Sequence, residues 1–120
     1  MNKNNSFLLI PKYENYIYYM LNIIFKIPKT EKFNIGNEFK NSIYQTLENI
    51  LFIEKIEKAK RLYYLNIIDT KINYQRILIR IMYKNRWIDI KKYNIAFEKI
   101  SEIGKILGGL IKYYGKNYKK

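Results

Sequence analysis

Apolar residues recur at intervals of three and four along most of this chain, and this spacing is the feature that most limits its possible folds. The series Tyr13, Ile17, Met20, Ile24 and Ile27 is one example. Residues three and four apart share one face of an α-helix, whereas a half-buried strand alternates with a period of two. No segment alternates cleanly in that way, although isoleucine and tyrosine favour strands by propensity. The spacing therefore predicts an all-α protein.

Four helical segments are predicted, and the first and the last have local signals at their ends. Pro28 ends the first, because a residue that precedes proline is disfavoured in helical dihedrals. Asp89 stands at the N-cap position of the last, and Gly115 is a C-terminal stop signal. The predicted segments are residues 12–27, 35–54, 59–84 and 90–114. Helices of this length with short connections favour an antiparallel up-down four-helix bundle.

The chain has one composition throughout its 120 residues, which indicates a single domain with two short flanks. We expect residues 1–11 to form a flexible N-terminal lead, residues 12–114 the bundle, and residues 115–120 a basic C-terminal tail. The chain has no cysteine and no apolar run of about 18 residues, the length of a membrane span. The apolar run near the start is too short for the core of a signal peptide. A cytoplasmic, soluble protein is the expectation.

Charge is the main functional signal in the composition. The chain carries 23 Lys and Arg residues against 10 Asp and Glu residues, a formal net charge of +13. Such an excess attracts polyanions. The basic residues are spread over all segments and do not form one amphipathic anchor, so nucleic acid is favoured over a membrane surface. The alternative is a solvated surface that reflects a proteome rich in Lys, Asn and Ile.

The side chains of common catalytic sites are mostly missing. The chain has no histidine and no cysteine, which removes the commonest general base, the commonest metal ligands and one nucleophile. Glu98 and Glu102 are four apart and could hold a divalent ion for a carboxylate-dependent nuclease. Lys99 and Lys105 lie nearby, however, and make a solvated ionic face the stronger interpretation. We therefore expect no enzymatic activity, no metal and no cofactor.

Cationic residues are the candidate binding residues. Arg76 and Arg80 are four apart, so one helix face carries two guanidinium groups, each able to contact phosphate oxygens through two N–H groups. Two further clusters lie near helix–helix turns. One contains Lys58, Lys60 and Arg61, and the other contains Lys84, Arg86, Lys91 and Lys92. Trp87 lies within the second cluster and either stacks on an unpaired base or caps the core. The candidates are Lys58, Lys60, Arg61, Arg76, Arg80, Lys84, Arg86, Lys91 and Lys92.

Three glycines in the last predicted helix need a reason, because each costs about 1 kcal/mol relative to alanine in a helix interior. They are Gly104, Gly108 and Gly109. We expect another helix, in the same bundle or in a neighbouring subunit, to pack closely against them. Tyrosines on more than one face of a helix, such as Tyr18 and Tyr19, likewise indicate subunit contacts or base stacking.

Two segments resemble a known family of small four-helix bundles. IPKTEKFNIGNEF at residues 27–39 resembles its Phe/Ile-Pro-Lys-x-x-x-Phe link between the first two helices. EIGKILGGLIK at residues 102–112 resembles its C-terminal Glu-hydrophobic-Gly-Arg/Lys-hydrophobic-Leu-Gly-Gly/Ser-Trp signature, with Leu110 in place of the Trp. The family is the accessory variability determinant (Avd) of diversity-generating retroelements, and its relatives are encoded in intervening sequences of 23S ribosomal RNA genes. The resemblance covers about residues 12–113.

The resemblance implies a homopentameric barrel with a basic surface and no catalytic activity. It also implies that the protein binds the reverse transcriptase of the retroelement and template RNA or cDNA, and so supports mutagenic cDNA synthesis. The Arg-x-x-x-Arg pair of the family matches Arg76 and Arg80, which makes them contacts to nucleic acid or polymerase. The alternative within the same fold is a structural or RNA-binding protein of the ribosomal RNA intervening-sequence type.

Overall fold

Four long helices and two short ones make up the part of the chain that the structure describes. This structure is a computed structural model, which describes the backbone of residues 2–117 and the side chains of residues 8–117. No strand occurs within those residues. The elements are α1 Asn2–Lys26, α2 Lys29–Lys32, α3 Ile35–Ile53, the 3₁₀ helix η1 Lys58–Lys60, α4 Arg61–Lys84 and α5 Ile90–Asn117.

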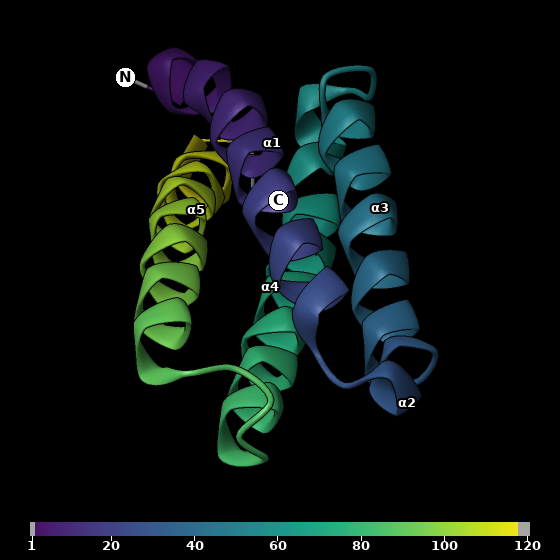
Figure 1. Cartoon of the computed structure of the whole chain (residues 1–120). Coiled ribbons are helices and arrows are strands. Elements are labelled where there is room, and N and C mark those ends of the chain that lie inside the picture. Colours follow the sequence, from purple (N-terminus) through teal and green to yellow (C-terminus); the bar gives the residue numbers. More distant parts are fainter. Residues whose placement is uncertain (1, 118–120) are drawn as a thin grey trace.

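The long helices run up and down along one axis of a body that measures 47 × 23 × 21 Å (Figure 1). Helix α5 packs along both α1 and α4, and α4 packs along α3, whereas α1 and α3 are the neighbouring pair with the least extensive contact. The prediction of an all-α antiparallel four-helix bundle is therefore confirmed for a single chain. No helix among residues 2–117 is both long enough and apolar enough to cross a membrane.

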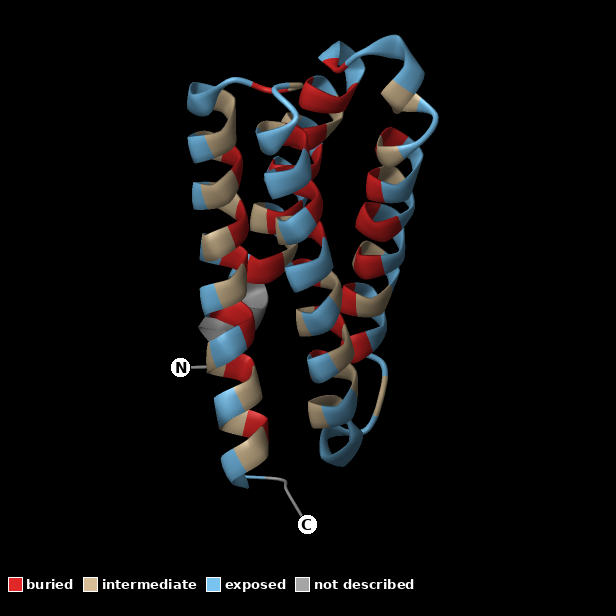
Figure 2. Cartoon of the chain, turned by 90° about the horizontal axis from the view of Figure 1, so that it is seen from below, coloured by how far each residue is buried: buried red, intermediate tan, exposed pale blue. Residues whose placement is uncertain are grey.

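The core follows the helical spacing of the sequence. On α4, Leu65, Ile68, Ile72, Ile79 and Met82 are completely buried. Buried positions form inward-facing stripes on the long helices, and exposed positions face outward (Figure 2). Full burial of one such side chain contributes about 1.5–3 kcal/mol relative to exposure. These stripes are what hold the four helices together.

Helix α1 begins well before the boundary predicted at Pro11, and it continues through this proline. Proline removes one N–H donor and its ring crowds the preceding turn, which costs about 3 kcal/mol in a helix interior. Leu9, Tyr13 and Tyr16 share one face and are buried against the bundle, so packing offsets that cost. The boundary of the lead at Pro11 was wrong for the backbone, whereas the flexibility expected of residues 1–11 stays a prediction.

Helix α5 also runs further than predicted, to Asn117. Gly115 does not end it, because no glycine among the described residues adopts the positive φ of a C-terminal glycine cap. The basic tail predicted for residues 115–120 is therefore helical over its first three residues. Residues 118–120 of that tail lie outside the described residues.

A polar cluster that the sequence analysis did not predict lies in the centre of the bundle. Gln75 of α4 is completely buried, and its Oε1 accepts a 2.8 Å hydrogen bond from the Tyr16 hydroxyl. Its Nε2 lies 3.2 Å from the Tyr13 hydroxyl, 3.1 Å from Ser42 Oγ and 3.3 Å from Thr46 Oγ1. The Tyr13 hydroxyl donates in turn to the Ile43 carbonyl oxygen at 3.0 Å. Gln75 therefore joins α1, α3 and α4 through buried hydrogen bonds.

Alkaline pH is expected to destabilise the fold through this cluster. Burial raises the pKa of Tyr13 from 10.0 to about 12. As the pH rises, the unfolded chain therefore loses this proton before the folded chain does. The stability that the protonated Tyr13 hydroxyl contributes is fully present below pH 10 and is lost as the pH rises towards about 12. We expect the free energy of unfolding to fall by about 1.4 kcal/mol per pH unit in that window. Urea unfolding followed by circular dichroism measures it.

The variant Tyr13→Phe lacks the ionisable hydroxyl and should show a shallower dependence of unfolding free energy on pH. Tyr63→Phe, on the exposed face of α4, is the matched control and should keep the slope of the unaltered chain. Equal slopes in both variants would contradict the assignment to Tyr13.

Candidate nucleic-acid interface

In the structure, the predicted cations lie in three places: one group at each end of the bundle and one pair between the ends. Lys58, Lys60 and Arg61 lie at the turn between α3 and α4, at the top of Figure 1. The turn between α4 and α5, at the bottom, brings together the other cluster, which is Lys84, Arg86, Lys91 and Lys92. Arg76 and Arg80 lie along α4. The nine predicted residues therefore do not form one continuous site within the chain.

Arg76 turns towards α5 and is half-buried. Its Nη1 donates a 2.8 Å hydrogen bond to Asn73 Oδ1, and its Nε is buried without a hydrogen-bond partner among the described residues. A β-carbon at Gly104 would collide with this guanidinium, whose Cζ would lie 3.4 Å away. The glycine therefore makes room for an arginine side chain, and the backbone of another helix is not what requires it. Arg76 and Arg80 do not present a matched pair on one exposed face.

The other two glycines have different surroundings. Gly108 is exposed, and a β-carbon there would have no atom of the described residues within 4 Å. Of the two alternatives, close packing inside the bundle does not account for Gly108, and a contact with another subunit stays a prediction. Gly109 is half-buried.

The Arg61 guanidinium forms contacts within the chain, to Tyr114 and to the backbone of Glu54. Its Nη1 donates to the Tyr114 hydroxyl at 2.8 Å and its guanidinium carbon lies 5.7 Å from the centre of the Tyr114 ring. A weaker 3.5 Å bond joins Nη2 to the Glu54 carbonyl oxygen. These contacts tie the start of α4 to the end of α5, so of the three cations predicted at this turn only Lys58 and Lys60 are exposed.

The turn after α4 has an uncommon backbone. The amide of Arg86 donates to the Tyr83 carbonyl at 2.9 Å, and the amide of Trp87 donates to the Met82 carbonyl at 2.9 Å. This pair of bonds is the Schellman ending of a helix, whose central residue adopts a left-handed conformation and is usually glycine. Arg86 occupies that position with a φ of 64°. This ending could not be predicted from the sequence, because KNRW contains no glycine.

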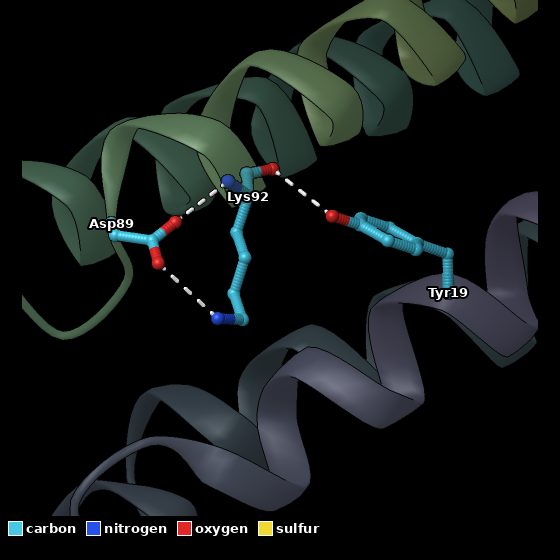
Figure 3. Close-up of polar contacts among 3 residues, drawn as sticks. All are labelled: Tyr19, Asp89 and Lys92. Atoms are coloured by element: carbon cyan, nitrogen blue, oxygen red, sulfur yellow. Dashed lines mark hydrogen bonds and ion pairs between the residues drawn. The ribbon is translucent and has the colours of Figure 1, made fainter.

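Asp89 caps α5 as predicted. Its Oδ1 accepts a 2.8 Å hydrogen bond from the Lys92 amide, and its Oδ2 lies 3.3 Å from Lys92 Nζ (Figure 3). The hydrogen bond from the Lys92 amide is the largest factor that lowers the pKa of Asp89. The Lys92 carbonyl accepts a long, 3.5 Å bond from the Tyr19 hydroxyl of α1. Lys92 is thus held at the start of α5, and its charge is already paired.

A cavity of about 590 Å³ opens at this end of the bundle. It is bounded by the end of α1, the end of α4 and the turn before α5. Four cations and one carboxylate are among the residues that line it, which are Ile23, Lys26, Tyr83, Lys84, Arg86, Trp87, Ile88, Asp89, Ile90 and Lys92. Lys84, Arg86 and Lys92 were predicted, and the structure brings them together. Lys26 was missed, because only the folded topology places the end of α1 beside a turn near residue 87.

Of the candidate carboxylate pair Glu98 and Glu102, only Glu102 forms an ion pair within the described residues. Glu102 is exposed and forms a 3.0 Å ion pair with Lys12 of α1, which is half-buried. Glu98 is exposed one turn away. Within the described residues, no three acidic, histidine or cysteine side chains gather as metal ligands would. The expected absence of a metal and of catalysis stays a prediction.

A basic, four-helix up-down bundle with cationic turns at its two ends is the class of protein that fold and surface define. The chain belongs to the bAvd-like family, whose family model matches residues 7–114. The resemblance found in the two motifs is thereby confirmed at the level of the family.

A solved structure agrees with the fold. The chain is similar to the crystal structure of a protein with unknown function from the S23 ribosomal protein family of Bacteroides thetaiotaomicron, with a TM-score of 0.79 and 18% identity. The match covers 90% of this chain and 98% of that one. A comparison with curated proteins gives no match.

Proposed function

We propose that this protein is a non-enzymatic accessory protein of a diversity-generating retroelement. In this role it binds the reverse transcriptase of the element together with template RNA or cDNA, in the cytoplasm, and supports mutagenic cDNA synthesis. The observation that carries the proposal is membership of the bAvd-like family over residues 7–114. Accessory proteins of this family are in general not catalysts, which agrees with a chain that has neither histidine nor cysteine.

The charge distribution supports a polyanionic partner. Only two ion pairs occur among the described residues, Lys12 with Glu102 and Lys92 with Asp89. Arg80, Lys84 and Arg86 are exposed, and their side chains have no hydrogen-bond or ion-pair partner within the described residues. Unpaired cations at an exposed surface are available to phosphate groups, whose condensed counterions they release on binding.

Two separate apolar surfaces support a homopentameric ring. Phe25 of α1 and Tyr44 of α3 are exposed and line a cavity of about 300 Å³ between these helices, and Tyr18 of α1 is also exposed. Ile77 and Ile81 of α4 are also exposed, and neither lines that cavity. A closed ring needs two different patches on each subunit, one for each neighbour. A native mass five times that of one chain is the expected result.

Co-purification with a reverse transcriptase tests the proposed partners. The chain is expressed with the reverse transcriptase and template RNA of a diversity-generating retroelement, and the complex is isolated through a tag on the enzyme. We expect Arg80→Ala to weaken retention of the accessory chain several-fold, because the exposed guanidinium is lost while the core is unchanged. Lys112→Ala, at an exposed position of α5, is the matched control. Arg76→Ala is less informative, because it also removes contacts inside the bundle.

No association with the enzyme in the unaltered chain would overturn the retroelement role. RNA binding that persists without any association with the polymerase would favour the second candidate, an RNA-binding protein of the ribosomal RNA intervening-sequence type. The structural similarity to a protein of the S23 ribosomal protein family is the observation in favour of that candidate.

A further inference from the structure

We propose that the cavity at the turn between α4 and α5 binds one unstacked nucleotide of a single-stranded nucleic acid. Trp87 holds the base, and Lys26, Lys84 and Arg86 hold the adjoining phosphates. The inference rests on the proposed function, because it specifies how the chain would bind RNA or cDNA. The proposed ligand is single-stranded, because bases in a duplex are stacked and cannot reach an aromatic side chain in a recess.

The shape and lining of the cavity suit a base. Its volume of about 590 Å³ is within the usual range of small-molecule sites, about 300–1,000 Å³. Trp87 packs against the core and also lines the cavity, so it serves as a core cap and still contributes surface to the recess. Ile23, Ile88 and Ile90 supply apolar walls. Tyr83, also in the lining, is fixed by stacking on Tyr93 with ring centres 4.4 Å apart.

The charges around the cavity suit phosphate. Lys26, Lys84 and Arg86 are exposed, and no side chain among the described residues pairs with them. Asp89 is the one carboxylate in the lining, and it is already engaged by the Lys92 amide and by Lys92 Nζ. The rim therefore keeps three uncompensated positive charges beside an aromatic ring, which is the combination that single-strand binding proteins use.

The backbone at Arg86 adds an independent observation. An arginine stands in a left-handed conformation, with a φ of 64°, at the helix ending where glycine is usual. A strained conformation of this kind persists where the surrounding structure imposes it, and such residues cluster at binding sites. Here the geometry directs a guanidinium-bearing residue into the cavity lining, where a glycine would satisfy the backbone better.

Fluorescence tests the inference directly, because Trp87 is the single tryptophan of the chain. The full chain is titrated with a short single-stranded RNA, with a strand of equal length whose central nucleotides are abasic, and with a duplex. Anisotropy of a label on each strand measures affinity separately from tryptophan emission. We expect the intact strand to quench Trp87 and to bind at least about fivefold more tightly than the abasic strand. The duplex should bind without quenching.

Two variants of the cavity lining test the roles of Arg86 and Trp87 separately, and a third variant is the control. Arg86→Gly removes a phosphate contact and relieves the backbone, so affinity should fall about threefold to tenfold while the melting temperature stays equal or rises. Trp87→Phe should remove most of the difference between intact and abasic strands. Lys112→Gln, remote from the cavity, should change neither quenching nor affinity. If Trp87→Phe does not fold, quenching of the unaltered chain and Arg86→Gly still decide the result.

Two failures are distinguishable. If RNA binds but intact and abasic strands have equal affinity and Trp87 emission does not change, the cavity inference is overturned and the proposed function stands. If no strand binds at any salt concentration, both are overturned.

Discussion

Replacing Gln75 by leucine is expected to lower the free energy of unfolding by about 4 kcal/mol. The side chains have similar volumes, so the loss comes from hydrogen bonds and not from a cavity. The Tyr16 hydroxyl, which donates to Gln75 Oε1 at 2.8 Å, would stay buried without its acceptor. Ser42 and Thr46 would lose the amide that approaches both of their hydroxyls. Chemical unfolding followed by far-ultraviolet circular dichroism measures the change.

The double variant Gln75→Leu with Tyr16→Phe separates unsatisfied polarity from poor packing. Replacing both partners by apolar groups of similar shape is often close to neutral, so the second substitution should recover part of the loss. Additive losses in the two single variants would contradict the interpretation, because they would mean that the two side chains do not interact.

Affinity for single-stranded RNA is expected to fall at least about 50-fold between roughly 50 and roughly 200 mM salt. Four exposed cations lie along the end of α4 and around the cavity: Lys26, Arg80, Lys84 and Arg86. Each neutralised phosphate contributes about 0.7 to the logarithmic slope for single strands, which gives about 2.8 for four. Filter binding or anisotropy at several salt concentrations measures the slope.

Arg86→Gly should reduce that slope by about 0.7, whereas Lys112→Gln should leave it unchanged. A slope near zero in the unaltered chain would show that the charge does not act on phosphates. It would favour the alternative in which the basic composition merely reflects the proteome.

The helices were predictable because their signals are local. Ile68, Ile72 and Ile79 reveal the buried face of α4 by spacing alone, and Asp89 reveals a helix start by its type and place. Two predicted ends were wrong, because proline and glycine are only local stop signals. The burial of Leu9 and Tyr13 outweighs Pro11, and such packing cannot be inferred from a residue and its neighbours in the chain. Gly115 does not adopt the positive φ of a helix stop, and α5 continues to Asn117.

The candidate site was predictable by residue type but not by arrangement. The excess of cations identified Lys84, Arg86 and Lys92, yet the fold was needed to add Lys26 and to remove Arg61 from the exposed set. The polar core was missed because nothing local in the sequence distinguishes the buried Gln75 from a surface glutamine. What distinguishes it is its hydrogen-bond partners, which come from two other helices: Tyr13, Tyr16, Ser42 and Thr46.

Gly104 determines where one positive charge of this protein is located. With no side chain at that position, the Arg76 guanidinium lies against α5. Burial raises the pKa of the Tyr16 hydroxyl well above its ordinary value, and the positive charge of Arg76 opposes part of that rise. In the variant Gly104→Ala the added β-carbon would collide with this guanidinium, so the end of the flexible side chain would have to move. We expect it to move towards solvent, which would leave the net charge unchanged and expose one more cation on the outer surface. Composition alone therefore overstates how much of the +13 is available to a partner.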